Sequence, residues 1–392
     1  MILQLLKNSK KKISGISIII VTLFSSLTSA QWNFTLSTDH ELNSNPFRSP
    51  FPEQQFYSSF NIGIQREFED LSILYYGSYS RFYETNERNS YWHQLGFYNN
   101  DESTTFGIYA NQRYNTVDYD FFNYTDATGY LKQKIDWSFM NVLLQTSATY
   151  RLYNNLKSYN NALFTFGLQL NKSFETKTTF IVQSLLSYKN YVNTGTESII
   201  QGGRSGKGMM WGGGYSSTYA DTISYPKVTS TQIFSSIRIA QSLFENTGIA
   251  AYYQNRSLIE GSGTWYGGTN YNYGDESDLY DDPISRRENT FGLELTQILP
   301  ELIILKSGFM YSDRIYPSQG IYTDAETLVV DLNRNDKQKY YYISLSKSFL
   351  LSEESGQSLN LNLAYNYINS ESNSFWYNYN LKQISMNLGF AF

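Results

Sequence analysis

The feature that most constrains the fold of this chain is an alternation of apolar and polar residues with a period of two. The last ten residues show it plainly: one phase is small or polar, and the other consists of Ile384, Met386, Leu388, Phe390 and Phe392. Successive side chains of a β-strand point to opposite faces, so the alternation predicts strands with one apolar and one polar face. The same pattern recurs at residues 60–65, 162–170, 291–296 and 359–367. We therefore predict an all-β chain.

The alternating segments predict sixteen strands, or fourteen if two weaker segments are excluded. The two weaker segments are residues 31–38 and 126–135. The remaining predicted strands are residues 71–83, 91–98, 104–113, 138–152, 178–189, 231–241, 247–254, 303–314 and 339–349. Either count is even, as it is in antiparallel transmembrane barrels formed by single bacterial chains.

The connections between the predicted strands alternate in length. The short connections are residues 66–70, 99–102, 171–176, 244–247, 299–301 and 352–357. The long connections are residues 114–126, 190–228, 261–288 and 315–337. When the strands are numbered backward from the C-terminus, all short connections fall at one end of the sheet and all long ones at the other.

The apolar faces of these strands must be buried in a protein core or in a lipid bilayer. The chain has 36 Tyr, 25 Phe and 6 Trp, yet its mean hydropathy is −0.43. Aromatic residues combined with a polar average are typical of two-faced strands and not of buried helices. A soluble β-sandwich or propeller would also show alternation. The one-sided loop lengths, the apolar last strand and the lack of internal repeats argue against that alternative.

In these respects the chain resembles the outer-membrane β-barrel proteins of Gram-negative bacteria. Their short turns lie on the periplasmic side and their long loops on the outside, and their closed sheet leaves no unpaired edge. The most specific element is residues 384–392, which are similar to the C-terminal signal that the barrel-insertion machinery recognises. Leu388, Phe390 and Phe392 would carry that signal. The resemblance implies an antiparallel transmembrane β-barrel over residues 31–392, in contact with the lipid of the cell outer membrane.

The N-terminus is predicted to be a signal peptide over residues 1–30. Four lysines precede an apolar run at residues 13–24, and the small residues Thr28 and Ala30 stand at the cleavage positions. The run is shorter than the roughly 20 residues that a membrane-spanning helix needs. The chain has no cysteine, which excludes a disulfide framework and a thiolate metal site.

The polar phase of the strands predicts which side chains line the lumen. A charged side chain on the lipid face costs about 2–4 kcal/mol at mid-membrane, so the charges of the strands must point inward. The predicted charged residues of the lumen are Arg113, Arg151, Lys189, Arg238, Glu294, Lys306 and Arg314. The predicted aromatic residues are Tyr76, Trp92, Tyr109, Tyr252 and Tyr342. With Glu294 as the one clear acid, the excess of basic residues favours anionic solutes. Alternatively, these cations pair with acids and brace the wall.

No residue is predicted to be catalytic. The only histidines are His40, predicted to lie in a loop, and His93, whose register points toward lipid. A Ser–His–Asp arrangement would need one of them as its base. No metal or cofactor is expected, and the absence of a basic stripe argues against nucleic acid as a partner.

Two loop segments resemble motifs of more specific function but do not match them. The glycine-rich residues 201–214 do not match a phosphate-binding loop, because position 201 is Gln and Gly208 replaces the Ser or Thr. This segment is either an outer loop or a loop folded into the mouth of the barrel. The acidic residues 273–283 do not have the spacing of an EF-hand.

The sequence thus predicts a non-enzymatic, porin-like barrel that passes small polar or anionic solutes. The alternative is a barrel with a plugged lumen that binds partners through its surface or serves secretion or assembly. An outer-membrane hydrolase is the least favoured function.

Overall fold

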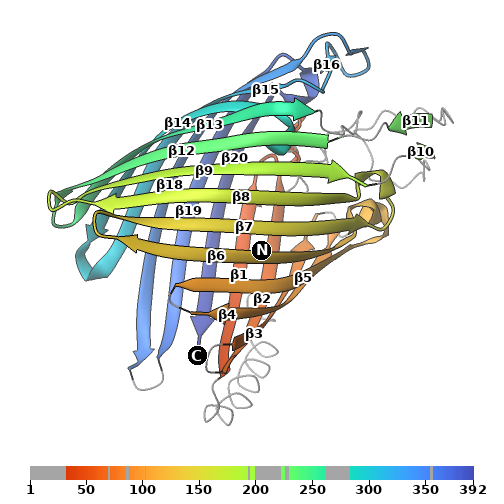
Figure 1. The fold of residues 1–392 in the computed structure, drawn as a ribbon. Helices are drawn as coiled ribbons and strands as arrows, with labels where there is room; N and C mark the ends of the chain where they lie inside the picture. Colours follow the sequence, from red (N-terminus) through yellow and green to blue (C-terminus); the bar gives the residue numbers. More distant parts are fainter. Residues whose placement is uncertain are drawn as a thin grey trace, which may run out of the picture.

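The computed structural model describes residues 32–68, 71–84, 88–101, 103–192, 195–198, 222–225, 229–261, 283–353 and 356–392. The chain forms a closed antiparallel barrel of sixteen strands, in which every strand pairs with its neighbours in chain order (Figure 1). The fold class predicted from the sequence is therefore confirmed. Within the described residues, none of the helical segments has the length and apolar character needed to cross a bilayer.

The barrel strands run in chain order from β1 to β20. Their bounds are β1 Trp32–Asn43, β2 Gln55–Phe68, β3 Leu71–Phe82, β4 Ser90–Asn100, β5 Thr104–Asn115, β6 Tyr124–Trp137, β7 Met140–Tyr153, β8 Asn161–Ser173, β9 Thr178–Tyr191, β12 Thr229–Phe244, β13 Thr247–Gly261, β14 Arg287–Leu299, β15 Ile303–Tyr316, β18 Arg334–Ser352, β19 Gln357–Ser372 and β20 Tyr379–Ala391. Two short hairpins stand outside the barrel: β10 Gly195–Ser198 with β11 Thr222–Tyr225, and β16 Ile321–Tyr322 with β17 Leu328–Val329.

The two weaker segments of the sequence are both barrel strands, β1 and β6. The count is therefore sixteen, and the alternative of fourteen is wrong. Both strands are longer than predicted: β1 continues to Asn43 and so includes His40, which the sequence had placed in a loop. The reason is that the far end of β1 carries Asp39 and Glu41 on its inner face, and a run of charged residues is easily taken for a loop.

The barrel closes where β1 pairs with β20. Backbone hydrogen bonds join Phe34 N to Phe392 O at 2.8 Å and Phe392 N to Phe34 O at 3.0 Å. The apolar phase of the last strand shares one face with Leu36 and Leu42 of β1, because Leu36 pairs with Phe390 and Leu42 with Ile384. The alternating residues of the last strand thus form one side of the seam, the β1–β20 junction at which the barrel closes.

Tight turns and longer connections lie at opposite ends of the barrel, as predicted. Only residues 138–139 separate β6 from β7, whereas residues 317–333 separate β15 from β18. The predicted loops at 114–126 and 315–337 are shorter in the structure, which has residues 116–123 and 317–333 there. Most of the predicted loops at 190–228 and 261–288, and the whole predicted signal at 1–30, lie outside the described residues.

The outer face of the barrel is an apolar belt. Large apolar side chains are exposed on it around the circumference, including Phe60, Leu95, Ile108, Phe166, Ile237, Leu293, Ile343 and Met386. Ile108 is 64% and Leu293 56% exposed. Exposed apolar surface on this scale requires lipid in place of water. The chain is therefore a transmembrane barrel, and single-chain bacterial barrels of this type span the outer membrane.

Candidate functional site

The candidate functional site is the inner face of the barrel, which carries the phase opposite to the apolar belt. The strand register places all twelve residues predicted to line the lumen on this face: Tyr76, Trp92, Tyr109, Arg113, Arg151, Lys189, Arg238, Tyr252, Glu294, Lys306, Arg314 and Tyr342. For example, Arg113 pairs with Trp92 and Arg151 with Asp126. In each strand, the residues directly before and after these inward residues point outward.

Arg151 is held by an acid of the neighbouring strand. Its Nη2 atom lies 2.8 Å from Oδ2 of Asp126, whose side chain is 1% exposed. Asn111 also donates to Asp126, with its Nδ2 atom 2.7 Å from Oδ1. The Arg151 guanidinium lies 4.3 Å from the ring centroid of Tyr124. The cation is therefore fixed to the wall by a paired charge and an aromatic face.

Glu288 forms the centre of a second group of charges at the start of β14. Its carboxylate lies 2.8 Å from Nη2 of Arg286, 3.2 Å from Nε of Arg314 and 3.3 Å from Nε of Arg256. The side chain of Glu288 is 8% exposed. One buried carboxylate thus organises three guanidinium groups.

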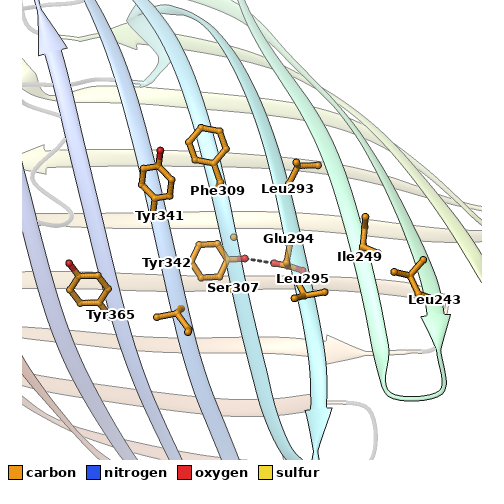
Figure 2. A pocket seen from close by; sticks show the side chains of 12 residues that line it. Leu243, Ile249, Leu293, Glu294, Leu295, Ser307, Phe309, Tyr341, Tyr342 and Tyr365 are labelled. Carbon is orange, nitrogen blue, oxygen red and sulfur yellow. Dashed lines mark hydrogen bonds between the residues drawn. The ribbon is translucent and has the colours of Figure 1, made fainter.

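Glu294 lies lower on the wall and joins a cation to a tyrosine. The Tyr342 hydroxyl donates to Oε2 of Glu294 at 2.5 Å (Figure 2), and Nη2 of Arg238 lies 3.4 Å from Oε1. The inner wall here carries a connected set of polar groups contributed by β12, β14 and β18.

A hollow of about 590 Å³ lies in the same region of the wall, and Glu294 and Tyr342 are among the residues that line it (Figure 2). Most of its lining consists of side chains of the apolar belt: Leu243, Ile249, Leu293, Leu295, Phe309, Tyr341, Ile343 and Tyr365. Because these side chains point outward, the hollow faces hydrocarbon.

The inner face holds several acids that the sequence interpretation missed. Asp39 accepts hydrogen bonds from Asn61 at 2.7 Å and Asn387 at 2.5 Å. Glu41 accepts from Gln383 at 2.6 Å and also bonds the Tyr57 hydroxyl. The expectation that Glu294 is the one clear acid is therefore wrong.

The missed acids share a position in the fold. Asp39, Glu41, Asp126, Glu288 and Asp336 all lie near the long-loop end of their strands. Four of them lie outside the predicted strands, in segments predicted to be loops, and Asp126 begins the weaker predicted segment 126–135. The signal that could have identified them is their phase, since each alternates in step with inward residues of the same strand.

Aromatic side chains from two connections cover part of the inner face at the long-loop end. The cluster consists of Phe122, Tyr124, Tyr153, Leu156, Tyr159 and Tyr191, all buried. Tyr124, Tyr153 and Tyr191 come from β6, β7 and β9, and the other members from the segments 117–122 and 156–159. The Nζ atom of Lys189 lies 5.1 Å from the Tyr191 ring centroid. These two connections therefore fold over the inner wall.

A second set of contacts between a connection and the barrel lies at the long-loop end of β18. The guanidinium of Arg334 lies 4.0 Å from the ring centroid of Tyr316 and 3.2 Å from that of Tyr377. Arg334 also pairs with Asp336 and donates to Oε1 of Gln319 at 2.9 Å. Arg334 and Asp336 both have side chains that are 3% exposed. This arrangement fixes the connections that follow β15 and β19 to the barrel.

Both histidines lie on the outer face. His40 Nδ1 is 2.7 Å from the Ser58 hydroxyl, and His93 Nδ1 is 2.8 Å from the Tyr75 hydroxyl. Their register pairs them with Met386 and Gly77, away from the lumen. Among the described residues, no group of three or more potential ligands is placed to hold a metal ion. The glycine-rich residues 201–214 and the acidic residues 273–282 lie outside the described part of the chain.

No protein-family model matches the sequence, and no curated protein is similar to it. Several solved outer-membrane proteins are similar in fold. OccK8 (OprE) of Pseudomonas aeruginosa is 9% identical, with a TM-score of 0.49 over 92% of this chain and 98% of that chain. OpdK of Pseudomonas aeruginosa, solved with vanillate, is 7% identical, with a TM-score of 0.47 over 92% and 98%. OccAB1 of Acinetobacter baumannii is 10% identical, with a TM-score of 0.46 over 92% and 96%. The inner face of this chain's own barrel therefore carries the functional inference.

Proposed function

We propose that the protein is a porin-like channel of the outer membrane that passes small polar solutes. The observation that carries this proposal is the contrast between the two faces of the closed barrel. The outer face is an apolar belt, and the inner face carries charged, amide and hydroxyl side chains. Polar inner walls suit water, and barrels of 16–18 strands are wide enough for an aqueous channel.

The charges of the inner wall argue for weak selectivity between anions and cations. Arg151, Arg238 and Arg314 each lie within 3.4 Å of a carboxylate oxygen. A cation that is already paired contributes little net potential to a passing anion. For Arg151 and Arg238 these contacts support the alternative in which the charges brace the wall, whereas the three guanidinium groups that share the Glu288 carboxylate support a modest preference for anionic solutes.

The proposed partners follow from the two surfaces of the barrel. Outer-membrane lipid would contact the apolar belt, and small polar solutes would contact the inner wall. We also propose that the barrel-insertion machinery engages the last strand through Leu388, Phe390 and Phe392, which lie on its outer face. A hydrolase that used either histidine as its base would need that histidine beside a nucleophile or an oriented water, and both histidines point away from the lumen.

Conductance across a planar lipid bilayer tests the proposal. The purified protein, folded into detergent micelles and added to the bilayer, is expected to produce stepwise current in potassium chloride. The expected permeability ratio of potassium to chloride is slightly below one, because Arg151 and Arg238 are paired with carboxylates whereas three guanidinium groups share the Glu288 carboxylate. A folded barrel that inserts without conducting would contradict the channel and favour the barrel with a plugged lumen. Folding is checked independently by β-sheet circular dichroism.

A further inference from the structure

Four tyrosines of the inner face each lie across a glycine of the neighbouring strand. The pairs are Tyr76 with Gly63, Tyr130 with Gly107, Tyr252 with Gly292, and Tyr342 with Gly308. A Cβ atom added at Gly107 would lie 2.7 Å from each of Cε1, Cζ and Oη of Tyr130. At Gly292 it would lie 2.0 Å from Cζ of Tyr252. The missing side chain lets each ring lie against the wall and leaves its other side toward the lumen.

The four tyrosines form two opposed groups. Tyr76 and Tyr252 lie on β3 and β13, the third and eleventh strands in the order of sixteen. Tyr130 and Tyr342 lie on β6 and β18, the sixth and fourteenth. Each pair is therefore separated by eight strands, half of the circumference. Tyr76 and Tyr130 therefore form one group, and Tyr252 and Tyr342 form the other. The two groups face each other across the lumen.

The four rings lie below the mouth: Tyr76 and Tyr252 are five residues, Tyr130 seven and Tyr342 ten residues from the short-turn ends of their own strands. Tyr342 is hydrogen-bonded to Glu294, which is five residues before Leu299 at the end of β14.

Amide side chains occupy the inner wall between the two groups. On one side are Gln145, Gln169 and Gln183, and on the other are Asn362 and Asn387. Each lies four or five residues from the short-turn end of its strand. Near the rings, Glu294 contacts Tyr342 and is paired with Arg238, and Lys132 lies 5.4 Å from the Tyr130 ring centroid.

This combination matches one class of solute. The apolar C–H faces of a sugar ring pack on aromatic rings, and its hydroxyl groups bond to amides. We propose that the lumen selects carbohydrates, as uncharged ring solutes rich in hydroxyl groups that pack on the four tyrosines. The inference rests on the proposed channel and specifies its solute. A planar aromatic solute would also pack on the rings, but it would make little use of the amide walls.

Maltotriose added to the conducting channel tests the inference. It is expected to reduce the potassium chloride current in a saturable manner. Tyr252→Leu and Tyr342→Leu each remove one ring and are expected to weaken the apparent affinity roughly two- to tenfold, the range for a single aromatic contact. Tyr342→Phe keeps the ring and loses the bond to Glu294, so its affinity should stay close to that of the unmodified protein.

The chain offers matched controls beside both rings. Tyr253 and Tyr341 are the next residues along the strands, and their side chains lie on the outer face. Tyr253→Leu and Tyr341→Leu are expected to leave the maltotriose affinity unchanged. Equal loss in the outward and inward variants would point to a general disturbance of the barrel and would contradict the assignment.

The outcomes separate the solute class from the channel itself. Conductance without any block by maltotriose overturns the inference and leaves the channel intact, and so does a block by benzoate alone. A block that Tyr252→Leu and Tyr342→Leu do not weaken also overturns it. If the folded protein does not conduct, the channel fails. Maltotriose is then titrated against tryptophan fluorescence in micelles, where binding weakened by the inward variants alone supports the inference and lack of binding overturns it.

Discussion

Residues of the inner wall contribute in two ways: glycines leave space for neighbouring rings, and acids contact neighbouring cations. Gly292 and Gly308 leave space for the rings of Tyr252 and Tyr342 to lie against the wall, whereas Asp126 and Glu288 form ion pairs with neighbouring arginines. Local substitutions should therefore have effects that depend on face and on partner. Two predictions follow at this scale.

Gly292→Ala is expected to destabilise the barrel by about 1–3 kcal/mol, because the added Cβ must displace the Tyr252 ring. Gly129→Ala is the matched control, since a Cβ atom there would have nothing within 4 Å. The measurement is urea-induced unfolding of the protein in lipid vesicles, followed by tryptophan fluorescence. Equal stabilities of the two variants would contradict the close contact at Gly292.

Arg334→Ala is expected to cost about 3–5 kcal/mol, because it leaves the buried Asp336 carboxylate without its charged partner. Lys339→Ala removes the exposed pair with Glu371, whose side chains are 42% and 57% exposed, and is expected to cost less than about 1 kcal/mol. The same unfolding measurement compares the two. A similar small effect in both variants would show that the Arg334 contacts contribute little.

At the scale of elements, β20 and the β16–β17 hairpin differ in their place in the fold. β20 closes the barrel against β1 and carries the apolar phase to Phe392, whose ring lies 5.5 Å from that of Phe34. The hairpin instead stands outside the barrel, where Ser374 bonds the backbone of Tyr322 at 3.0 Å. The first element closes the barrel, and the second is joined to the connection that follows β19.

Phe392→Ser is expected to reduce the fraction of chains that assemble into the membrane, since it removes the ring packed on Phe34 and polarises the lipid face of the seam. Ala391→Ser changes the adjacent position, whose register places it on the inner face, and should assemble normally. The assembled fraction is read from the mobility shift between unheated and boiled samples on gels. Normal assembly of Phe392→Ser would exclude a role for this ring in closure or insertion.

The turn in the β16–β17 hairpin is expected to weaken in acid. Backbone amides of Glu326 and Thr327 donate to Asp324 at 2.9 and 2.7 Å and hold the pKa of its carboxyl below the usual 3.8. A lowered pKa stabilises the folded turn above pH 3.8, and this contribution is lost as the pH falls through the folded pKa. Amide hydrogen exchange at Thr327 should therefore become less protected below that pH relative to Asp324→Asn. Identical pH profiles would contradict the linkage.

For the molecule as a whole, the separation of an apolar exterior from a polar interior determines the location in the membrane and supports the proposed channel. The outward phase continues around the sixteen strands, and the inward phase collects the ion pairs, amides and tyrosines. A charge should be tolerated or rejected according to the face on which it is placed.

Leu186→Arg and Ser187→Arg compare the two faces at adjacent positions of β9. Leu186 is 44% exposed on the outer belt, and Ser187 pairs with Gln232 on the inner wall. The outward arginine is expected to cost about 2–4 kcal/mol in a bilayer, because it meets hydrocarbon. The inward arginine should cost much less and should shift the permeability ratio toward chloride. Unfolding in vesicles and reversal potentials measure the two effects, and equal costs would contradict the membrane assignment.

The sequence by itself determined the fold class, limited the strand count to sixteen or fourteen, and indicated which strand residues face outward. A period of two is a local property of an extended backbone, and exclusion of charge from lipid selects the outward phase without reference to any other strand. The bounds of β1, β14 and β18 were less accurate, because acids on the inner phase at their long-loop ends resemble loop residues. Only the tertiary structure decided which charges are paired and which rings face each other. Asp126 meets Arg151, Glu41 meets Gln383 and Tyr76 stands opposite Tyr252 because of register and closure. Those depend on how distant strands align, and an alternation within one strand carries no record of that alignment.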